Sequence, residues 1–206
     1  MADLRRAGPA DLPQLTRMLT RAFRDDPTTF WLFPEPGSRL RRLERMIAWE
    51  LATSPLTGGE LVVAGEAAAA ALWLAPHPDG GPPRLGWRAQ LRLTVGAARV
   101  FGRRLPVVAA GFARLAQQLP PQPHRYLSIL GTEPGRQRSG LGTALLREGL
   151  CRSDREAVPT LLHTATAADV TFYGHRGFTV VGEARLPRGP LLWAMRREPG
   201  AGRAGG

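Results

Sequence analysis

The sequence contains no lysine, so all 28 of its basic side chains are arginines. Against 17 acidic residues they give a formal net charge of +11 at pH 7. The arginines are spread along the whole chain, which argues against a nucleic-acid-binding arm, and no aromatic-basic pattern marks a base-stacking surface. We therefore expect no nucleic acid as a partner. The excess charge indicates either a solvated arginine-rich surface or a polyanionic ligand held by a few arginines.

Cysteine occurs once, at Cys151, which excludes an internal disulfide and a cysteine cluster for zinc. We expect no metal site, and the cysteine usage agrees with a reducing compartment. Cys151 itself has two possible roles, as a nucleophile or as a packing residue. Its place near the apolar face of a predicted helix favours packing.

Long apolar runs are also lacking: no stretch of about 18 uncharged apolar residues occurs. The N-terminus "MADLRRAGPADL" has neither the apolar segment nor the cleavage site of a signal peptide. These absences predict a soluble, cytoplasmic protein without a membrane partner. The 206 residues suffice for one ordinary domain and are few for two. We expect a single domain over 1–198 and a disordered tail over 199–206, which has little to bury.

Strand-like and helix-like segments alternate in a mixed order. They predict an α/β (α+β) fold with one central, curved, mixed β-sheet of about seven strands and helices on both faces. The expected strands are 4–7, 60–65, 68–76, 125–133, 160–165, 178–184 and 191–197. The expected helices are one capped by Asp11, one capped by Ser38, two within 85–119 that are broken at Pro106, one after a glycine loop and one over 168–175. Residues 25–38 are expected to form a loop.

The glycine loop lies in "PGRQRSGLGTALLREGL", residues 134–150, between a predicted strand and a predicted helix. The first amides of a helix have no partner within it, and the helix dipole adds positive potential, so bare backbone there favours an anion. Leu141 stands where a nucleotide-triphosphate loop needs lysine, and Leu145 stands where a dinucleotide fingerprint needs glycine. What remains is Q-x-x-G-x-G, from Gln137 to Gly142.

In this context the sequence resembles the GNAT superfamily of acyl-CoA-dependent N-acetyltransferases. The segment "YLSILGTEPGRQRSGLGTALL" is similar to the family's strand, pyrophosphate loop and helix, and "FYGHRGFTVVGEA" is similar to its second signature. The segments "VAGEAAAAALWLAP" and "PRGPLLWAMRRE" further resemble the branch that contains puromycin N-acetyltransferase. The likeness runs from about Leu4 to Glu198 and is strongest from Arg125 onward.

The resemblance implies transfer of an acetyl group from acetyl-CoA directly to a primary amine of a small molecule, in a ternary complex. Amides of the loop would hold the pyrophosphate of coenzyme A, and a splayed or bulged strand before it would lend an amide to the thioester carbonyl. Tyr173 would be the general acid that protonates the thiolate, with a core tyrosine as the alternative. The implied coenzyme-binding residues are Ile129, Leu130, Gly131, Thr132, Gln137, Arg138, Ser139, Gly140, Leu141, Gly142, Thr143, Asp169, Phe172 and Arg176.

The general base is left open. Many relatives of this branch have glutamate at the position of His163 and asparagine at that of Asp169, so this chain departs from the pattern at both. His163 has the pKa for a base at neutral pH, and a structural histidine on a half-buried strand is the alternative. Weaker candidates are Glu133, Asp25, Asp26 and Glu35.

Two other functions also remain open: acetylation of a protein or peptide amine, and acyl-CoA binding without catalysis. The first would need an open groove in place of a closed pocket. The second is disfavoured by the presence of Tyr173. The assembly is expected to be a monomer or a homodimer.

Overall fold

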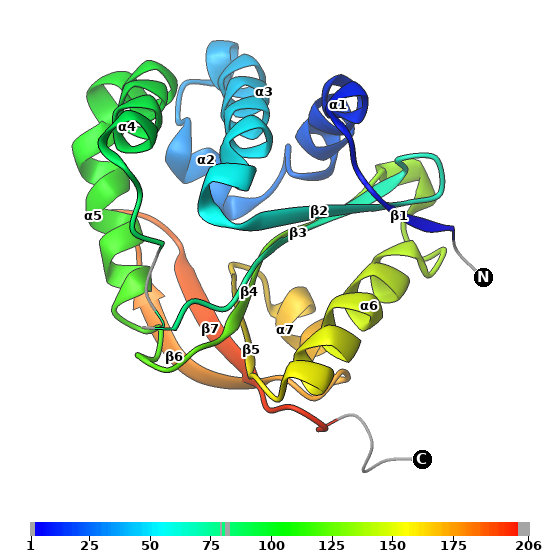
Figure 1. Cartoon of the computed structure of the whole chain (residues 1–206). Helices are drawn as coiled ribbons and strands as arrows, with labels where there is room; N and C mark the ends of the chain where they lie inside the picture. Colours follow the sequence, from blue (N-terminus) through cyan, green and yellow to red (C-terminus); the bar gives the residue numbers. More distant parts are fainter. Residues whose placement is uncertain (1–2, 79, 81–82, 202–206) are drawn as a thin grey trace.

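The structure, a computed structural model, describes residues 3–78, 80 and 83–201. Seven strands form one sheet in the order β1-β2-β3-β4-β5-β7-β6 (Figure 1). Strands β4 and β5 run parallel, and the other neighbouring pairs are antiparallel. The prediction of one mixed sheet with helices on both faces is therefore confirmed. The strands are β1 (Leu4–Arg6), β2 (Gly59–Ala64), β3 (Ala69–Leu74), β4 (Arg125–Thr132), β5 (Thr160–Thr164), β6 (Thr179–Arg185) and β7 (Leu191–Arg197).

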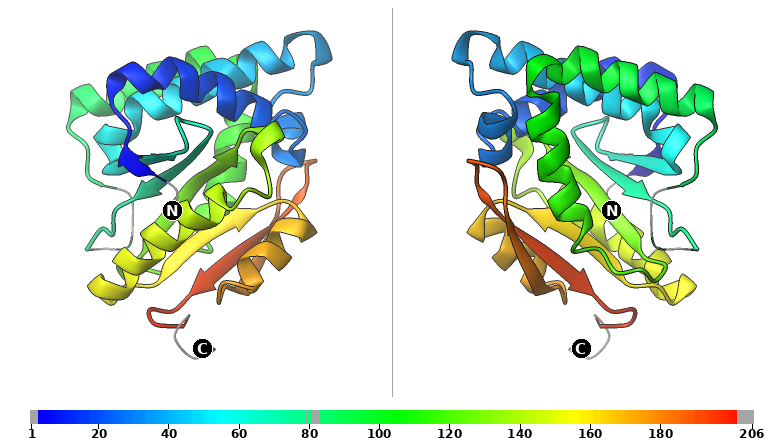
Figure 2. Two further views of the ribbon diagram at one scale, coloured as in Figure 1. Left: turned by 90° about the vertical axis from the view of Figure 1, so that its right-hand side faces the viewer. Right: turned by 90° about the vertical axis from the view of Figure 1, so that its left-hand side faces the viewer.

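Five of the described α-helices pack on one face of the sheet and two pack on the other. Figures 1 and 2 show these layers on the two sides of the sheet. Neighbouring strand residues alternate between the faces: Val63 packs with the five-helix side, and Val62 with the two-helix side. Each face therefore has its own apolar core, as the period of a strand requires. The first face carries α1 (Leu12–Ala22), α2 (Pro27–Leu32), α3 (Pro36–Thr53), α4 (Trp87–Phe101) and α5 (Leu105–Ala116), and the second carries α6 (Leu141–Glu156) and α7 (Ala167–Gly174).

The expected loop over 25–38 is wrong in part, because it contains α2. The Asp26 carboxylate accepts a hydrogen bond from the Thr28 amide at 2.7 Å and so caps that short helix. Ser38 is not a cap, because α3 already begins at Pro36, whose ring suits the first turn of a helix. Asp11 does not cap α1 either. Its carboxylate accepts from the Gly8 amide and from the Arg5 guanidinium, each at 2.7 Å.

The break between α4 and α5 lies at Gly102, not at the predicted Pro106. Gly102 has φ of 51°, in the left-handed region that favours glycine, and it ends α4. Pro106 stands in the first turn of α5, where the missing N–H costs no helical hydrogen bond.

Cys151 is exposed, so its predicted packing role is wrong. The buried side of α6 is narrower than the sequence suggested and leaves Cys151 outside it. The buried residues of α6 are Leu141, Leu145, Leu146, Gly149, Leu150 and Ser153.

At the C-terminus the Gly200 amide donates to Asp154 Oδ1 at 2.8 Å, which holds the first part of the predicted tail. The rest of that tail, 202–206, lies outside the described residues. In the part of the chain that the structure describes, no helix combines the length and apolar character needed to cross a membrane. Over the same residues, no three histidine, cysteine or carboxylate side chains gather as metal ligands would.

Candidate active site

The centre of the sheet opens where β4 and β5 part. The two strands pair only from Arg125 to Leu127 and from Thr160 to Leu162. Beyond Leu127, β4 keeps its hydrogen bonds to β3 on one side only. Every second peptide group of 128–132 therefore faces the opening, with no strand beside it. This is the splayed strand that the resemblance implied.

A β-bulge lies at the start of this opening. Leu72 of β3 pairs with Ile129 and Trp73 pairs with Leu127, so Ser128 is the extra residue. As a result Ser128 and Ile129 both face the five-helix side: Ile129 joins its core, and the Ser128 hydroxyl donates to Glu50 Oε1 at 2.9 Å. Bulges often redirect side chains beside functional sites.

The glycine loop presents a row of free amides after β4. The first backbone hydrogen bond of α6 runs from the Ala144 amide to the Gly140 carbonyl, at 2.9 Å. Among the described residues, no acceptor is found for the amides from Arg138 to Thr143. Residues 134–140 and Thr143 are exposed, Gly142 is half-buried and Leu141 is buried, so the loop side of this run is open to a ligand. A helix N-terminus with this many unpaired donors is suited to a phosphate group.

Two glycines fix the backbone of this region for different reasons. Gly140 has φ of 84°, and a Cβ added there would meet no atom within 4 Å, so its conformation and not crowding requires glycine. At Gly131 the limit is space, because a Cβ would lie 2.5 Å from Leu19 Cδ2 of α1. Gly131 thus lets α1 lie close against β4 where the strands part.

Arg176 brings a cation to the start of α6. Its guanidinium donates to Thr143 Oγ1 at 2.8 Å and to the Phe172 carbonyl at 2.5 Å. It also lies over the Phe172 ring, 3.7 Å from the centroid. Arg176 therefore joins two other predicted coenzyme-binding residues, Thr143 and Phe172, although Thr143 lies 33 residues before it in the sequence. Exposed Arg136 and Arg138 add charge to the same loop.

Tyr173 is buried on α7, on the side of the sheet that carries α6. Its ring meets Phe172 and Phe178 edge-on. Burial raises the pKa of Tyr173; the charge of Asp169 raises it further, and that of Arg176 lowers it. The phenol therefore keeps its proton at neutral pH, as a proton donor must.

Asp169 holds the start of α7. Its Oδ2 accepts from the Thr164 and Thr166 hydroxyls at 2.9 and 2.7 Å, and its amide donates to Thr166 Oγ1 at 3.1 Å. These bonds form a helix cap. Contact of Asp169 with the coenzyme stays a prediction.

His163 of β5 is engaged through both ring nitrogens. Nδ1 lies 2.9 Å from the Tyr126 hydroxyl, and Nε2 lies 3.2 Å from Gln118 Oε1. Since Oε1 only accepts, Nε2 carries the proton and Nδ1 accepts from the phenol. Burial lowers the pKa of His163 to about 4. A neutral, fully bonded ring fits the structural alternative, and its role as the base stays a prediction.

The weaker base candidates have other partners or are exposed. Glu133 pairs with Arg21 at 2.6 Å, and this bond lowers the pKa of Glu133. Asp25 is exposed beside Arg24, Asp26 caps α2, and Glu35 is exposed at the start of α3.

Glu50 is a candidate site residue that was not predicted from the sequence. This carboxylate lies one residue before buried Leu51 and three after buried Ile47, so it sits at the edge of the inward face of α3. An acidic residue on an apolar helical face was the signal that could have found it. Burial raises the pKa of Glu50, while the hydrogen bond from Ser128 lowers it.

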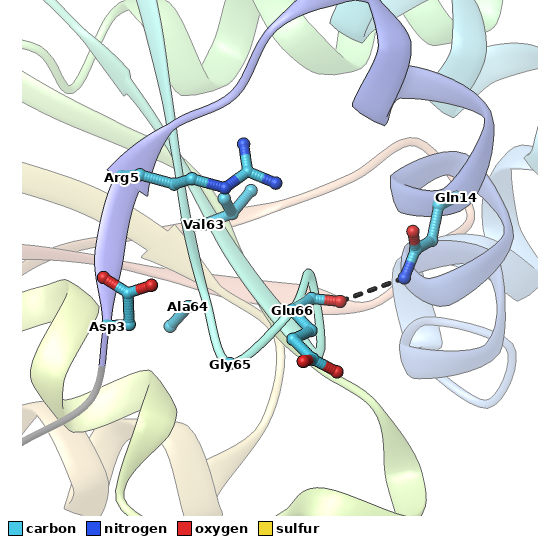
Figure 3. Close-up of a pocket in the computed structure, with 7 residues that line it drawn as sticks. All are labelled: Asp3, Arg5, Gln14, Val63, Ala64, Gly65 and Glu66. Atoms are coloured by element: carbon cyan, nitrogen blue, oxygen red, sulfur yellow. Dashed lines mark hydrogen bonds between the residues drawn. The ribbon is translucent and has the colours of Figure 1, made fainter.

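Glu50 lines a pocket of about 440 Å³ between α3, α4, α5 and the sheet. A second pocket, of about 350 Å³, lies beside the turn between β2 and β3 (Figure 3). There the Gln14 side-chain amide donates to the Glu66 carbonyl at 3.0 Å. None of the predicted site residues lines this second pocket. Its described lining residues are Asp3, Arg5, Gln14, Val63, Ala64, Gly65 and Glu66.

No protein-family model matches the chain. Among solved structures, it is similar to the Corynebacterium glutamicum protein described as histone acetyltransferase HPA2 and related acetyltransferase. The TM-score is 0.73 at 24% identity, over 96% of each chain. The fold is that of the GNAT acetyltransferases.

Two other acetyltransferase structures match over nearly their whole length. Arylalkylamine N-acetyltransferase 2 of Aedes aegypti has a TM-score of 0.62 at 14% identity, over 96% of this chain and 98% of that one. The yncA protein of Salmonella typhimurium, solved with its cofactor acetyl-CoA, has a TM-score of 0.52 at 16% identity, over 96% and 94%. At these identities the likeness is one of fold.

Proposed function

We propose that the protein is an N-acetyltransferase that moves an acetyl group from acetyl-CoA directly to a primary amine of a small molecule, in a ternary complex. The observation that carries this proposal is the run of free amides from Arg138 to Thr143, directly beside the opening between β4 and β5. A pyrophosphate fits these amides, with Arg176 next to them at Thr143. The thioester would then lie at the opening.

Each chemical requirement of the transfer has a candidate group in the chain. Free peptide amides of 129–132 would donate to the thioester carbonyl oxygen, where negative charge develops. The amine nitrogen forms a bond to the carbonyl carbon, and the bond from carbon to sulfur breaks. Tyr173 would give its proton to the departing sulfur. An ammonium substrate loses two protons overall: one ends on the thiol, through Tyr173, and the other leaves to solvent through a base.

The pocket walled by α3, α4 and α5 has a volume of about 440 Å³, which is the size of a site for a small organic ligand and supports a small-molecule acceptor over a protein amine. The solved relatives do not decide this point, because their names include both an arylalkylamine and a histone acetyltransferase. Tyr173, a buried phenol on the α6 side of the sheet that keeps its proton at neutral pH, supports catalysis over simple acyl-CoA binding.

Replacing Gly140 with valine should weaken acetyl-CoA binding at least about tenfold, equivalent to about 1.4 kcal/mol. Valine disfavours a φ of 84°, so the amides would turn away from the pyrophosphate, and its methyl groups would fill the open space at the loop. Calorimetric titration measures the dissociation constant.

The matched control is Gly135→Val in the same loop. Gly135 has no positive φ, and a Cβ there meets nothing within 4 Å, so this variant should bind acetyl-CoA like the wild type. Equal affinity of a folded Gly140→Val protein and the wild type would contradict the assignment of the loop.

A further inference from the structure

The pocket that contains Glu50 is apolar except for a few groups on one side. Its walls include Trp49 of α3, Phe101 of α4, Val108 and Phe112 of α5, and Leu72 of β3. Glu50 is the one ionisable side chain among the described residues that line it. Apolar walls with a single convergent charged group are typical of sites for small organic ligands.

The pocket meets the opening of the sheet from the side opposite to the coenzyme loop. Ser128 lines the pocket, donates to Glu50 at 2.9 Å and is the bulge residue at which β4 and β5 part. The next residue, Ile129, begins the segment whose free amides face the opening. The glycine loop leads into α6, on the other face of the sheet (Figure 2). A ligand in the pocket and a thioester in the opening would therefore meet beside Ser128.

We propose that this pocket binds a primary amine that carries an apolar group, with the nitrogen beside Glu50, and that Glu50 is the base of the transfer. This inference rests on the proposed acetyltransferase function and names its acceptor class. The carboxylate pairs with the ammonium form of the amine, and the apolar walls enclose its hydrocarbon part. An anionic acceptor would find no cationic side chain among the described residues that line the pocket. A strongly hydrated acceptor would lose water to mainly apolar walls. Both classes should therefore bind poorly.

The electrostatics around Glu50 agree with a proton acceptor. Burial raises the pKa of Glu50, which brings it nearer to neutral pH, where a base works best. The titratable group that faces it from β4 is Tyr126, whose own pKa is raised by burial and by the Glu50 charge. Behind Tyr126 lies the neutral ring of His163. Glu50 takes one proton from the bound ammonium and passes it to solvent, and Tyr173 supplies the thiol proton.

The first test compares Glu50→Gln with the wild type, using acetyl-CoA and 2-phenylethylamine. Glutamine keeps the shape of the side chain and the hydrogen bond from Ser128 but removes the charge, so kcat/KM should fall at least about 100-fold. Acetyl-CoA affinity should stay within a factor of about two, because Glu50 lies away from the loop. Glu44→Gln, at an exposed carboxylate of the same helix, is the control and should keep full activity.

The second test fills the pocket without touching Glu50. Ala97 of α4 lines the pocket, so Ala97→Phe should raise the KM for 2-phenylethylamine at least about tenfold, whereas Ala98→Phe, on the exposed side of α4, should not. Ethanolamine and spermidine should be poorer acceptors than 2-phenylethylamine in the wild type.

The outcomes separate this inference from the function on which it rests. If acetyl-CoA binds and another amine class is acetylated in preference, or if Glu50→Gln acetylates as fast as the wild type, the acceptor pocket is wrong and the acetyltransferase stands. If acetyl-CoA does not bind the wild type, both proposals fail.

Discussion

Replacing Tyr173 with phenylalanine should lower turnover by roughly 10²- to 10⁴-fold, the range that a general acid contributes. Phenylalanine keeps the ring between Phe172 and Phe178 and removes only the hydroxyl. Without its proton, the sulfur must leave as a thiolate. The measurement is the rate of thiol release at saturating acetyl-CoA and amine, with the dissociation constant of acetyl-CoA measured alongside.

Packing effects are controlled by Phe178→Leu, which alters the same aromatic cluster and leaves the phenol in place. We expect it to change turnover less than about tenfold. If Tyr173→Phe turns over as fast as the wild type, Tyr173 is a core residue and the thiolate leaves unassisted or is protonated by another group.

The second large effect concerns stability at low pH. The pKa of His163 is about 4 in the folded protein, against an ordinary value of 6.5. Between these values the unfolded chain binds a proton that the folded protein excludes, so stability falls as pH drops from about 6.5 to 4. The loss attributable to this ring is up to about 3 kcal/mol. Urea unfolding at pH 7 and pH 4.5 measures it.

In His163→Gln this part of the loss should disappear, so the free energy of unfolding should fall less between pH 7 and pH 4.5 in the variant than in the wild type. Contributions of other groups are common to both proteins and cancel in the comparison. His175→Gln, at an exposed histidine, is the control. An unchanged pH dependence in His163→Gln would show that the ring is solvated. Loss of the rise of rate with pH in the same variant would instead support His163 as the base, in place of Glu50.

The anion loop and the strands could be predicted from sequence because their causes are local. Free amides follow from a helix that begins after a glycine turn, and Q-x-x-G-x-G with its flanking strand lies within one short segment. The sequence rules for helix starts gave a wrong residue where two of them apply to neighbouring positions. At the start of α3, Ser38 matches the cap pattern, but Pro36 two residues earlier already suits the first turn.

The sequence marks Glu50 only as an acidic residue on an apolar helical face, and its role could not be assigned because its setting is tertiary. Its partner Ser128 is the bulge residue of β4, 78 residues further along the chain, and the walls of its pocket include helices between β3 and β4. Neither the bulge nor the position of α4 and α5 is marked by a local pattern. The same holds for His163, whose neighbours Tyr126 and Gln118 come from separate elements.

Thiol release from acetyl-CoA in the presence of an amine panel tests the central claim most directly. The panel contains 2-phenylethylamine, hexylamine, spermidine, ethanolamine and an arginine-free peptide with a free N-terminus, and the products are identified by mass spectrometry. We predict that thiol release depends on an added small amine, and that each thiol released is matched by one acetylated amine. Acetyl-CoA that binds but is consumed with no amine, or acetylation of the peptide alone, would contradict the account.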